Sequence, residues 1–107
     1  MDVILTMVLE EHRKIDGDAT ITQDTRLYGL ITGSVTVEAG AKLVVHGMVG
    51  GDLIVSDGSL VQVYGTVFGD IINRGDLKVI GKVRGQIRRE GGSTRIDPNA
   101  VIDGGVV

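Results

Sequence analysis

Few residues of this 107-residue chain have side chains that could carry out catalysis or bind a metal ion. Cysteine is absent, and the two histidines are His12 and His46. The chain contains a sequence repeat, and the position of His46 in its repeat unit is taken by Tyr28, Tyr64 and Ile80 in other units. These four residues include too few metal ligands for a metal site. The pattern predicts that His46 is a surface ladder residue; the alternative is a general base at a subunit interface.

Three aspartates, Asp18, Asp52 and Asp70, each follow a glycine that recurs along the chain. Stacked carboxylates can bind Ca²⁺ or act as the acid pair of a glycosidase. An aspartate directly after a glycine is more often a turn residue, whose side chain accepts nearby backbone N–H groups. The glycines match no phosphate-binding motif that opens a helix after a strand. We therefore expect no enzymatic activity, no bound metal and no cofactor.

The glycines before these aspartates belong to an internal repeat with spacings of 16, 18, 18 and 16 residues. The repeat consists of Gly17, Gly33, Gly51, Gly69 and Gly85, and the residues two before and two after each of them are aliphatic. A second glycine recurs four residues upstream, as Gly29, Gly47, Gly65 and Gly81. One such unit cannot bury its own apolar face, so successive units are expected to stack.

Within each unit, apolar residues stand two apart in short runs separated by Gly, Asp or Asn, which is the period of a β-strand. The sequence therefore predicts an all-β, single-stranded β-helix (β-solenoid) of about five to six short coils, with three short strands per coil. Two corners of each coil fall at the two glycine columns, and the third falls at Asp24, Gly40, Gly58 and Gly75. We divide the chain into an N-terminal cap or flank, residues 1–14, and a β-solenoid domain, residues 15–107.

The net charge of −3 hides an uneven distribution along the chain. Residues 1–73 contain four Lys or Arg against ten Asp or Glu, whereas residues 74–107 contain seven against four. A rod wound from this sequence has an acidic end and a basic end, the latter with Arg84, Arg88, Arg89 and Arg95. These charges either solvate the surface or meet an anionic partner or the acidic end of a neighbour. The overall charge does not favour nucleic acid as a partner.

The first nine residues are apolar but too few to span a bilayer, and they lack the basic start and the cleavage site of a signal peptide. We expect them to form a cap strand or a short helix; the alternative is a membrane-surface or subunit-contact segment. The missing cysteines favour the cytoplasm. The predicted location is cytoplasmic, with the inner face of the membrane as an option.

Two isoleucines, Ile54 and Ile72, occupy equivalent outward positions in adjacent coils, and Phe68 stands nearby in the chain. These three residues predict a lateral contact face. At an inward position, Asn73 and Arg89 replace the aliphatic residues of earlier coils. There we expect a register slip or an interior open to water, with Arg89 pointing outward and the last coil distorted.

The recurrent motif Gly-x-Val-x-Gly-Asp-Leu/Ile, at residues 47–53 and 65–71, together with the closing segment 96–104, resembles the bactofilin family. The resemblance covers roughly residues 15–107. It implies a right-handed β-helix that polymerises end to end into nucleotide-independent filaments, serving bacteria as a cytoskeletal scaffold for cell-shape and wall-modifying machinery. Residues 96–102 also look like the repeat of left-handed hexapeptide acyltransferases, but a strict six-residue period is absent elsewhere.

Growth from the ends suits a solenoid, because its first and last coils expose unpaired backbone groups above an apolar core. The predicted end-to-end contacts are Val3, Ile4 and Leu5 at one end and Val101, Ile102, Val106 and Val107 at the other. The predicted function is a non-enzymatic scaffold that binds copies of itself and a wall-associated or other protein. The alternative is a monomeric or small-oligomer binding module, such as an immunity or adaptor protein.

Overall fold

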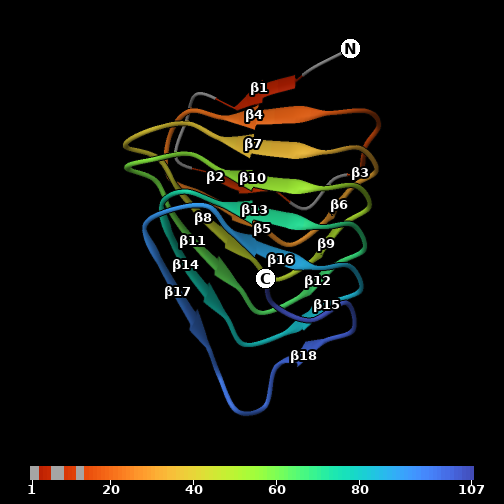
Figure 1. Ribbon diagram of the computed structural model, residues 1–107. Coiled ribbons are helices and arrows are strands. Elements are labelled where there is room, and N and C mark those ends of the chain that lie inside the picture. The colour runs from red at the N-terminus through yellow and green to blue at the C-terminus, as the bar shows by residue number, and fades with distance from the viewer. Residues whose placement is uncertain (1–2, 6–8, 12–13) are drawn as a thin grey trace.

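The computed structural model describes residues 3–5, 9–11 and 14–107, and the side chains of residues 14–107. This part of the chain is an all-β solenoid without a helix, and the chain passes through three sheets in turn (Figure 1). Each sheet contains six parallel strands, so the chain makes about five turns between the first and last strand of a sheet. The predicted fold, with three short strands per coil, is confirmed. Among these residues, no helical segment has the length and hydrophobicity that a membrane span requires.

The three sheets are named A, B and C in the order in which the chain enters them. Sheet A contains β1 (Val3–Leu5), β4 (Ala19–Ile21), β7 (Val35–Val37), β10 (Leu53–Val55), β13 (Ile71–Asn73) and β16 (Ile87–Arg89). Sheet B contains β2 (Leu9–Glu11), β5 (Thr25–Leu27), β8 (Lys42–Val45), β11 (Leu60–Val63), β14 (Asp76–Val79) and β17 (Ser93–Ile96). Sheet C contains β3 (Lys14–Ile15), β6 (Leu30–Ile31), β9 (Met48–Val49), β12 (Thr66–Val67), β15 (Lys82–Val83) and β18 (Val101–Ile102).

Equivalent residues of successive coils lie above one another because the parallel strands pair in register. Leu53, for example, pairs with Val35 on one side and with Ile71 on the other. Side chains alternate between the two faces of a strand, so every second residue enters the narrow interior. The inward columns consist almost entirely of fully buried branched aliphatics, including Ile21, Leu27, Ile31, Val35, Leu43, Val49, Leu53, Val61, Val67, Ile71, Leu77, Val83 and Ile87.

The three predicted corners are confirmed, since each predicted glycine column falls between two sheets. The column that starts at Gly17 lies between sheets C and A and forms a continuous backbone ladder. The N–H of Gly33 donates to the carbonyl of Gly17 (3.0 Å), and the N–H of Gly69 donates to that of Gly51 (3.0 Å). A Cβ atom at Gly69 would lie 2.6 Å from the Gly51 carbonyl oxygen. Glycine is required here because neighbouring backbones approach closely.

The aspartates after this glycine column accept backbone N–H groups, as predicted, but these groups belong to the next coil and not to the same turn. Oδ1 of Asp18 accepts the N–H of Ser34 (2.7 Å), and Oδ1 of Asp52 accepts the N–H of Asp70 (2.8 Å). Ser34 Oγ accepts the N–H of Asp52, and Asp70 Oδ1 accepts the N–H of Gln86. These bonds span 16 or 18 residues, and they extend the coil-to-coil ladder beyond the strands.

Asn73 occupies the inward column of Val55 without a register slip and without an opening to water, so both expected alternatives were wrong. The side chain is fully buried, and all of its polar atoms are bonded. Its Nδ2 donates to the carbonyl of Ser93 (2.8 Å) and to Thr94 Oγ1 (2.7 Å), and its Oδ1 accepts the N–H of Gly75 (3.0 Å). A buried amide is stable when its hydrogen bonds are satisfied, as they are here.

Arg89 follows Asn73 in the same column and is exposed, as predicted. The last coil departs from the earlier ones mainly at the corner between sheets B and C. Only two residues separate these sheets in the preceding coil, whereas four, residues 97–100, separate them here. The wider turn is closed by hydrogen bonds from the N–H groups of Asn99 and Ala100 to the side chain and carbonyl of Asp97.

Candidate functional site at the C-terminal end

The chain ends as an additional strand layer on sheet A. Val106 forms a parallel bridge with Ile87 in β16. The N–H of Ile87 donates to the carbonyl of Gly105 (3.0 Å), and the N–H of Val107 donates to the carbonyl of Ile87 (2.8 Å). The N–H of Arg89 donates to Val107 (2.8 Å). Residues 105–107 therefore cover β16, and they present the last edge of this sheet.

The core columns of the three sheets end together at this terminus. Ile96 continues the column of Val79, Ile102 continues that of Val83, and Val106 stands over Ile87. The three residues underneath are fully buried, whereas Ile96 is 38% exposed, Val106 is 36% exposed and Ile102 is partly buried. This terminus is therefore an apolar cross-section of the core with incomplete cover.

The backbone at this end can accept another strand. Strands β17 and β18 are the last strands of sheets B and C, and each pairs on one side only with the described chain (Figure 1). An edge strand presents free N–H and C=O groups in a row, to which another chain can bond. The edges of the three sheets surround the apolar centre formed by Ile96, Ile102 and Val106, and we call this combination the C-terminal face.

The structure brings three of the predicted C-terminal contact residues to this face or its edge. Ile102 and Val106 contribute to its apolar centre, and Val107 lies on the sheet A edge. Val101 lies in β18 and pairs with the outward residue Lys82, so it faces away from the core. Ile96 was not among the contact residues predicted from the sequence. Its signal was the spacing of 17 residues from Val79, close to the repeat length, directly before the Asp97-Pro98 turn.

The predicted basic residues lie in the last coils, near the C-terminal face. Arg88, Arg89 and Arg95 are exposed in β16 and β17. Arg84 forms an exposed ion pair with Asp103 (3.0 Å), and such surface pairs typically contribute about 0–1 kcal/mol. Among the described residues, Arg88 and Arg95 form no ion pair, so their charges are available to a partner.

At the N-terminal end, the predicted contacts Val3, Ile4 and Leu5 form β1. Val3 pairs with Ala19 and Leu5 with Ile21, which are core positions, whereas Ile4 pairs with the outward residue Thr20. These register positions would extend two core columns beyond β4. The side chains of these three residues lie outside the described part of the chain, so their role in contacts stays a prediction.

The predicted lateral face is divided between two sheets. Ile54 and Ile72 pair in register on the outer surface of sheet A, and both are half-buried. Phe68 follows β12 of sheet C and is 43% exposed. The two isoleucines therefore form a pair, but Phe68 belongs to a different side of the solenoid.

His46 lies between two tyrosine rings, which confirms the prediction of a surface ladder. Its imidazole ring stacks on Tyr28, with ring centroids 4.7 Å apart, and on Tyr64, with centroids 5.2 Å apart. The rings are nearly parallel, with interplanar angles of 6° and 12°. The stack connects three successive coils at the corner between sheets B and C. Among the described residues, no three His, Cys, Asp or Glu side chains are placed to hold a metal ion.

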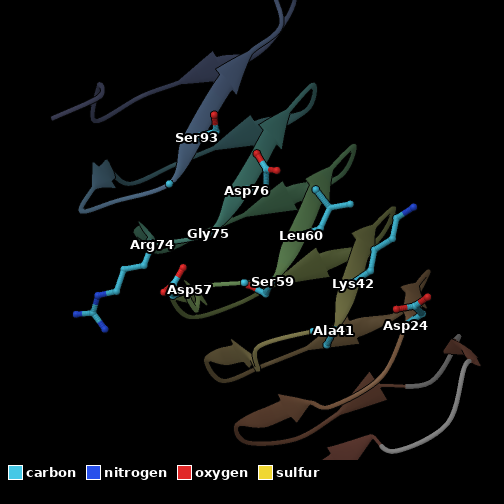
Figure 2. Close-up of a pocket in the computed structure, with 13 residues that line it drawn as sticks. Asp24, Ala41, Lys42, Asp57, Ser59, Leu60, Arg74, Gly75, Asp76 and Ser93 are labelled. Atoms are coloured by element: carbon cyan, nitrogen blue, oxygen red, sulfur yellow. The ribbon is translucent and has the colours of Figure 1, made fainter.

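A shallow groove of about 580 Å³ follows the corner between sheets A and B. In Figure 2, Asp24, Lys42, Leu60, Asp76 and Ser93 follow one another along one row, and Arg74 lies on the opposite side of the groove with Asp57. Glycine and small residues, among them Gly58 and Gly75, also line the groove. Since acidic and basic residues alternate along it, the groove selects no ligand by charge.

The described geometry defines this chain as a β-solenoid with parallel sheets on three sides and an apolar C-terminal face. Comparisons of the chain with protein-family models, with curated proteins and with solved structures find no match. Two features of the chain therefore bear on its function: the C-terminal face and the repeated sequence motif.

Proposed function

We infer that this protein is a non-enzymatic structural element that assembles end to end into filaments, as a bactofilin-like scaffold. The observation that carries the inference is the C-terminal face, where three core columns end at partly exposed Ile96, Ile102 and Val106. The resemblance of the repeat to bactofilins supports the same function. Other copies of the chain are its first partners in this proposal, and no cofactor or nucleic acid takes part.

The driving force of this assembly is the burial of an apolar surface together with strand pairing. Burying an exposed aliphatic side chain contributes about 1.5–3 kcal/mol, and the side chains of the C-terminal face would gain part of this value. A second copy would also pair with the free edges of β17, β18 and residues 105–107. Both contributions act over the same small surface, so a single charge at its centre should weaken them together.

In a cell, this proposal places the filament in the cytoplasm, with the inner face of the membrane as the second option. Its role there would be to position a wall-associated or other protein in processes such as cell shape. The exposed basic residues around the C-terminal face, including Arg88 and Arg95, suit contact with an acidic surface on a partner or on another copy.

Sedimentation and negative-stain microscopy of the purified protein test this function. We expect long polymers at low salt, and we expect Val106→Asp to abolish them because it places a charge between two apolar faces. Val44→Asp is the matched control, since Val44 is half-buried on the outer surface of sheet B, away from both ends. Circular dichroism shows whether both variants fold.

A strict monomer at high protein concentration and low salt would contradict filament formation and would favour a monomeric binding module. Polymers that persist in folded Val106→Asp would place the contact elsewhere on the molecule. The two results are distinguishable because the first concerns the wild-type chain and the second only the variant.

A further inference from the structure

The exposed apolar side chains form two separate groups. Among the residues whose side chains are described, eight large hydrophobic side chains are exposed. Four of them, Ile96, Val101, Val106 and Val107, belong to the last coil. The other four precede the last coil: Met48 lies in β9 of sheet C, Phe68 directly follows β12 at the corner with sheet A, and Tyr28 and Tyr64 lie at the corner between sheets B and C. End-to-end assembly accounts for the first group only.

Two residues of the second group, Met48 and Phe68, belong to two neighbouring columns on and beside the outer surface of sheet C. Leu30, Met48, Thr66 and Lys82 form one outward column, because β6, β9, β12 and β15 pair in register. Directly after each of these strands, toward sheet A, the chain forms a second column, which contains Thr32, Gly50, Phe68 and Arg84. The N–H groups of Gly50, Phe68 and Arg84 each bond to the coil before, so this column is also in register. We call these two columns the sheet C face.

Phe68 and Gly50 are direct neighbours in the second column, and they are its largest and its smallest residue. Phe68 extends into solvent, whereas Gly50, one coil earlier, adds no side chain to the surface. Aromatic residues and methionine are enriched in the centres of protein interfaces. A bulky side chain beside the exposed backbone of a glycine suits packing against an identical surface. The pair lies between the third and fourth of the six coils, which is the middle of the solenoid.

The charge distribution selects the relative direction of two such surfaces. Residues 1–73 have a net charge of −6 and residues 74–107 have a net charge of +3. Two copies that lie side by side in the same direction would bring like charges together, including Lys82 and Arg84 of both copies. Two antiparallel copies would bring the acidic part of each against the basic part of the other.

We propose that the sheet C face binds a second copy of this chain in an antiparallel, two-fold symmetric arrangement, with Phe68 of each copy packed over Gly50 of the other. The two-fold axis then passes between the third and fourth coils, so the two solenoids overlap along their full length. Met48 faces Thr66 of the second copy, and Leu30 faces its Lys82. This lateral contact is independent of the C-terminal face.

Disulfide cross-linking tests the arrangement cleanly because the chain contains no cysteine. We expect a mixture of Leu30→Cys and Lys82→Cys to form a cross-linked dimer under mild oxidation. Each variant alone should give little product, because three coils, about 14 Å at the strand spacing, separate position 30 from position 30 of the second copy. Cross-linking of Leu30→Cys to itself would indicate parallel copies and would overturn the proposal. The absence of a cross-linked product in the mixture would also overturn it.

A second measurement does not depend on cysteine chemistry. In the Val106→Asp background, where end contacts are removed, sedimentation equilibrium should still show a dimer. Adding Phe68→Arg should raise the dimer Kd by about tenfold or more, the effect of losing an interface hot spot. Thr36→Arg is the control, because Thr36 lies on the outer surface of sheet A. The dimer would be refuted if Val106→Asp is a monomer at all concentrations and the cysteine variants in the wild-type background give no cross-link. The sheet C face would then bind a different partner.

The lateral contact and the proposed filament can fail separately. Cross-linking at positions 30 and 82 without polymers in the wild type would support the dimer and contradict the filament. Polymers without this cross-link would support the filament and contradict the dimer.

Discussion

Ile96 lies directly above Val79 in sheet B and continues the same inward column, yet Ile96 is 38% exposed whereas Val79 is fully buried. The difference arises because Val79 is covered by one more coil and Ile96 is not. Every solenoid ends with such residues unless another part of the chain covers them. The position of Ile96 therefore gives a direct test of whether this end is covered by another molecule.

Replacing Ile96 by arginine should weaken end-to-end association without unfolding the protein. The guanidinium can remain in water in the free monomer, but it must lose water when a second copy covers it. We expect the concentration at which polymers form to rise about tenfold or more. Light scattering against protein concentration measures this. An unchanged threshold would show that the C-terminal face is not the contact.

Gly69→Ala should destabilise the fold by about 1–3 kcal/mol, the range for side chains inserted into filled space. The added Cβ would lie 2.6 Å from the Gly51 carbonyl oxygen and would also contact Asp52 Oδ1, so two coils must separate. Gly91→Ala is the control, since its nearest atom would be 3.6 Å away. Urea unfolding compares the two. Equal stability of both variants would contradict the requirement for close approach.

Removing the Asp52 carboxylate should cost about 0.5–1.5 kcal/mol, the net contribution of a typical hydrogen bond. Asp52→Ala leaves the N–H of Asp70 without its acceptor at 2.8 Å, whereas Asp52→Asn keeps an acceptor oxygen and should recover part of the loss. Asp57→Ala is a matched control, because Asp57 is exposed and its carboxylate has no hydrogen bond or ion pair within the described chain. If the alanine variants at 52 and 57 unfold at the same urea concentration, the aspartate ladder does not stabilise the coils.

Asn73→Val should destabilise the protein, although valine would restore the aliphatic column of Val37 and Val55. The substitution removes the acceptor of the Gly75 N–H and the donor to the Ser93 carbonyl and Thr94 Oγ1. An unsatisfied buried polar group costs about 1–3 kcal/mol. Chemical unfolding again provides the measurement. A more stable valine variant would show that packing in this column outweighs the amide hydrogen bonds.

Much of this fold could be predicted from the sequence, because the contacts join equivalent positions of a repeat. Gly33 lies over Gly17, and Ile72 lies over Ile54, because each pair occupies the same position of the repeat unit. Superposing the repeat units therefore predicts the strands, the corners and the inward columns together. The exposure of Arg89 was expected from the cost of burying its charge, although its register position is inward.

The rest depended on where side chains of different coils meet in space. The sequence did not show that Asp52 bonds to Asp70, that Asn73 finds partners in the following coil, or that Ile96 ends a core column. It also grouped Phe68 with Ile54, although a corner separates their sheets. A repeat specifies which residues are neighbours along a column, but hydrogen-bond directions and side-chain exposure depend on the folded path of the chain around each corner.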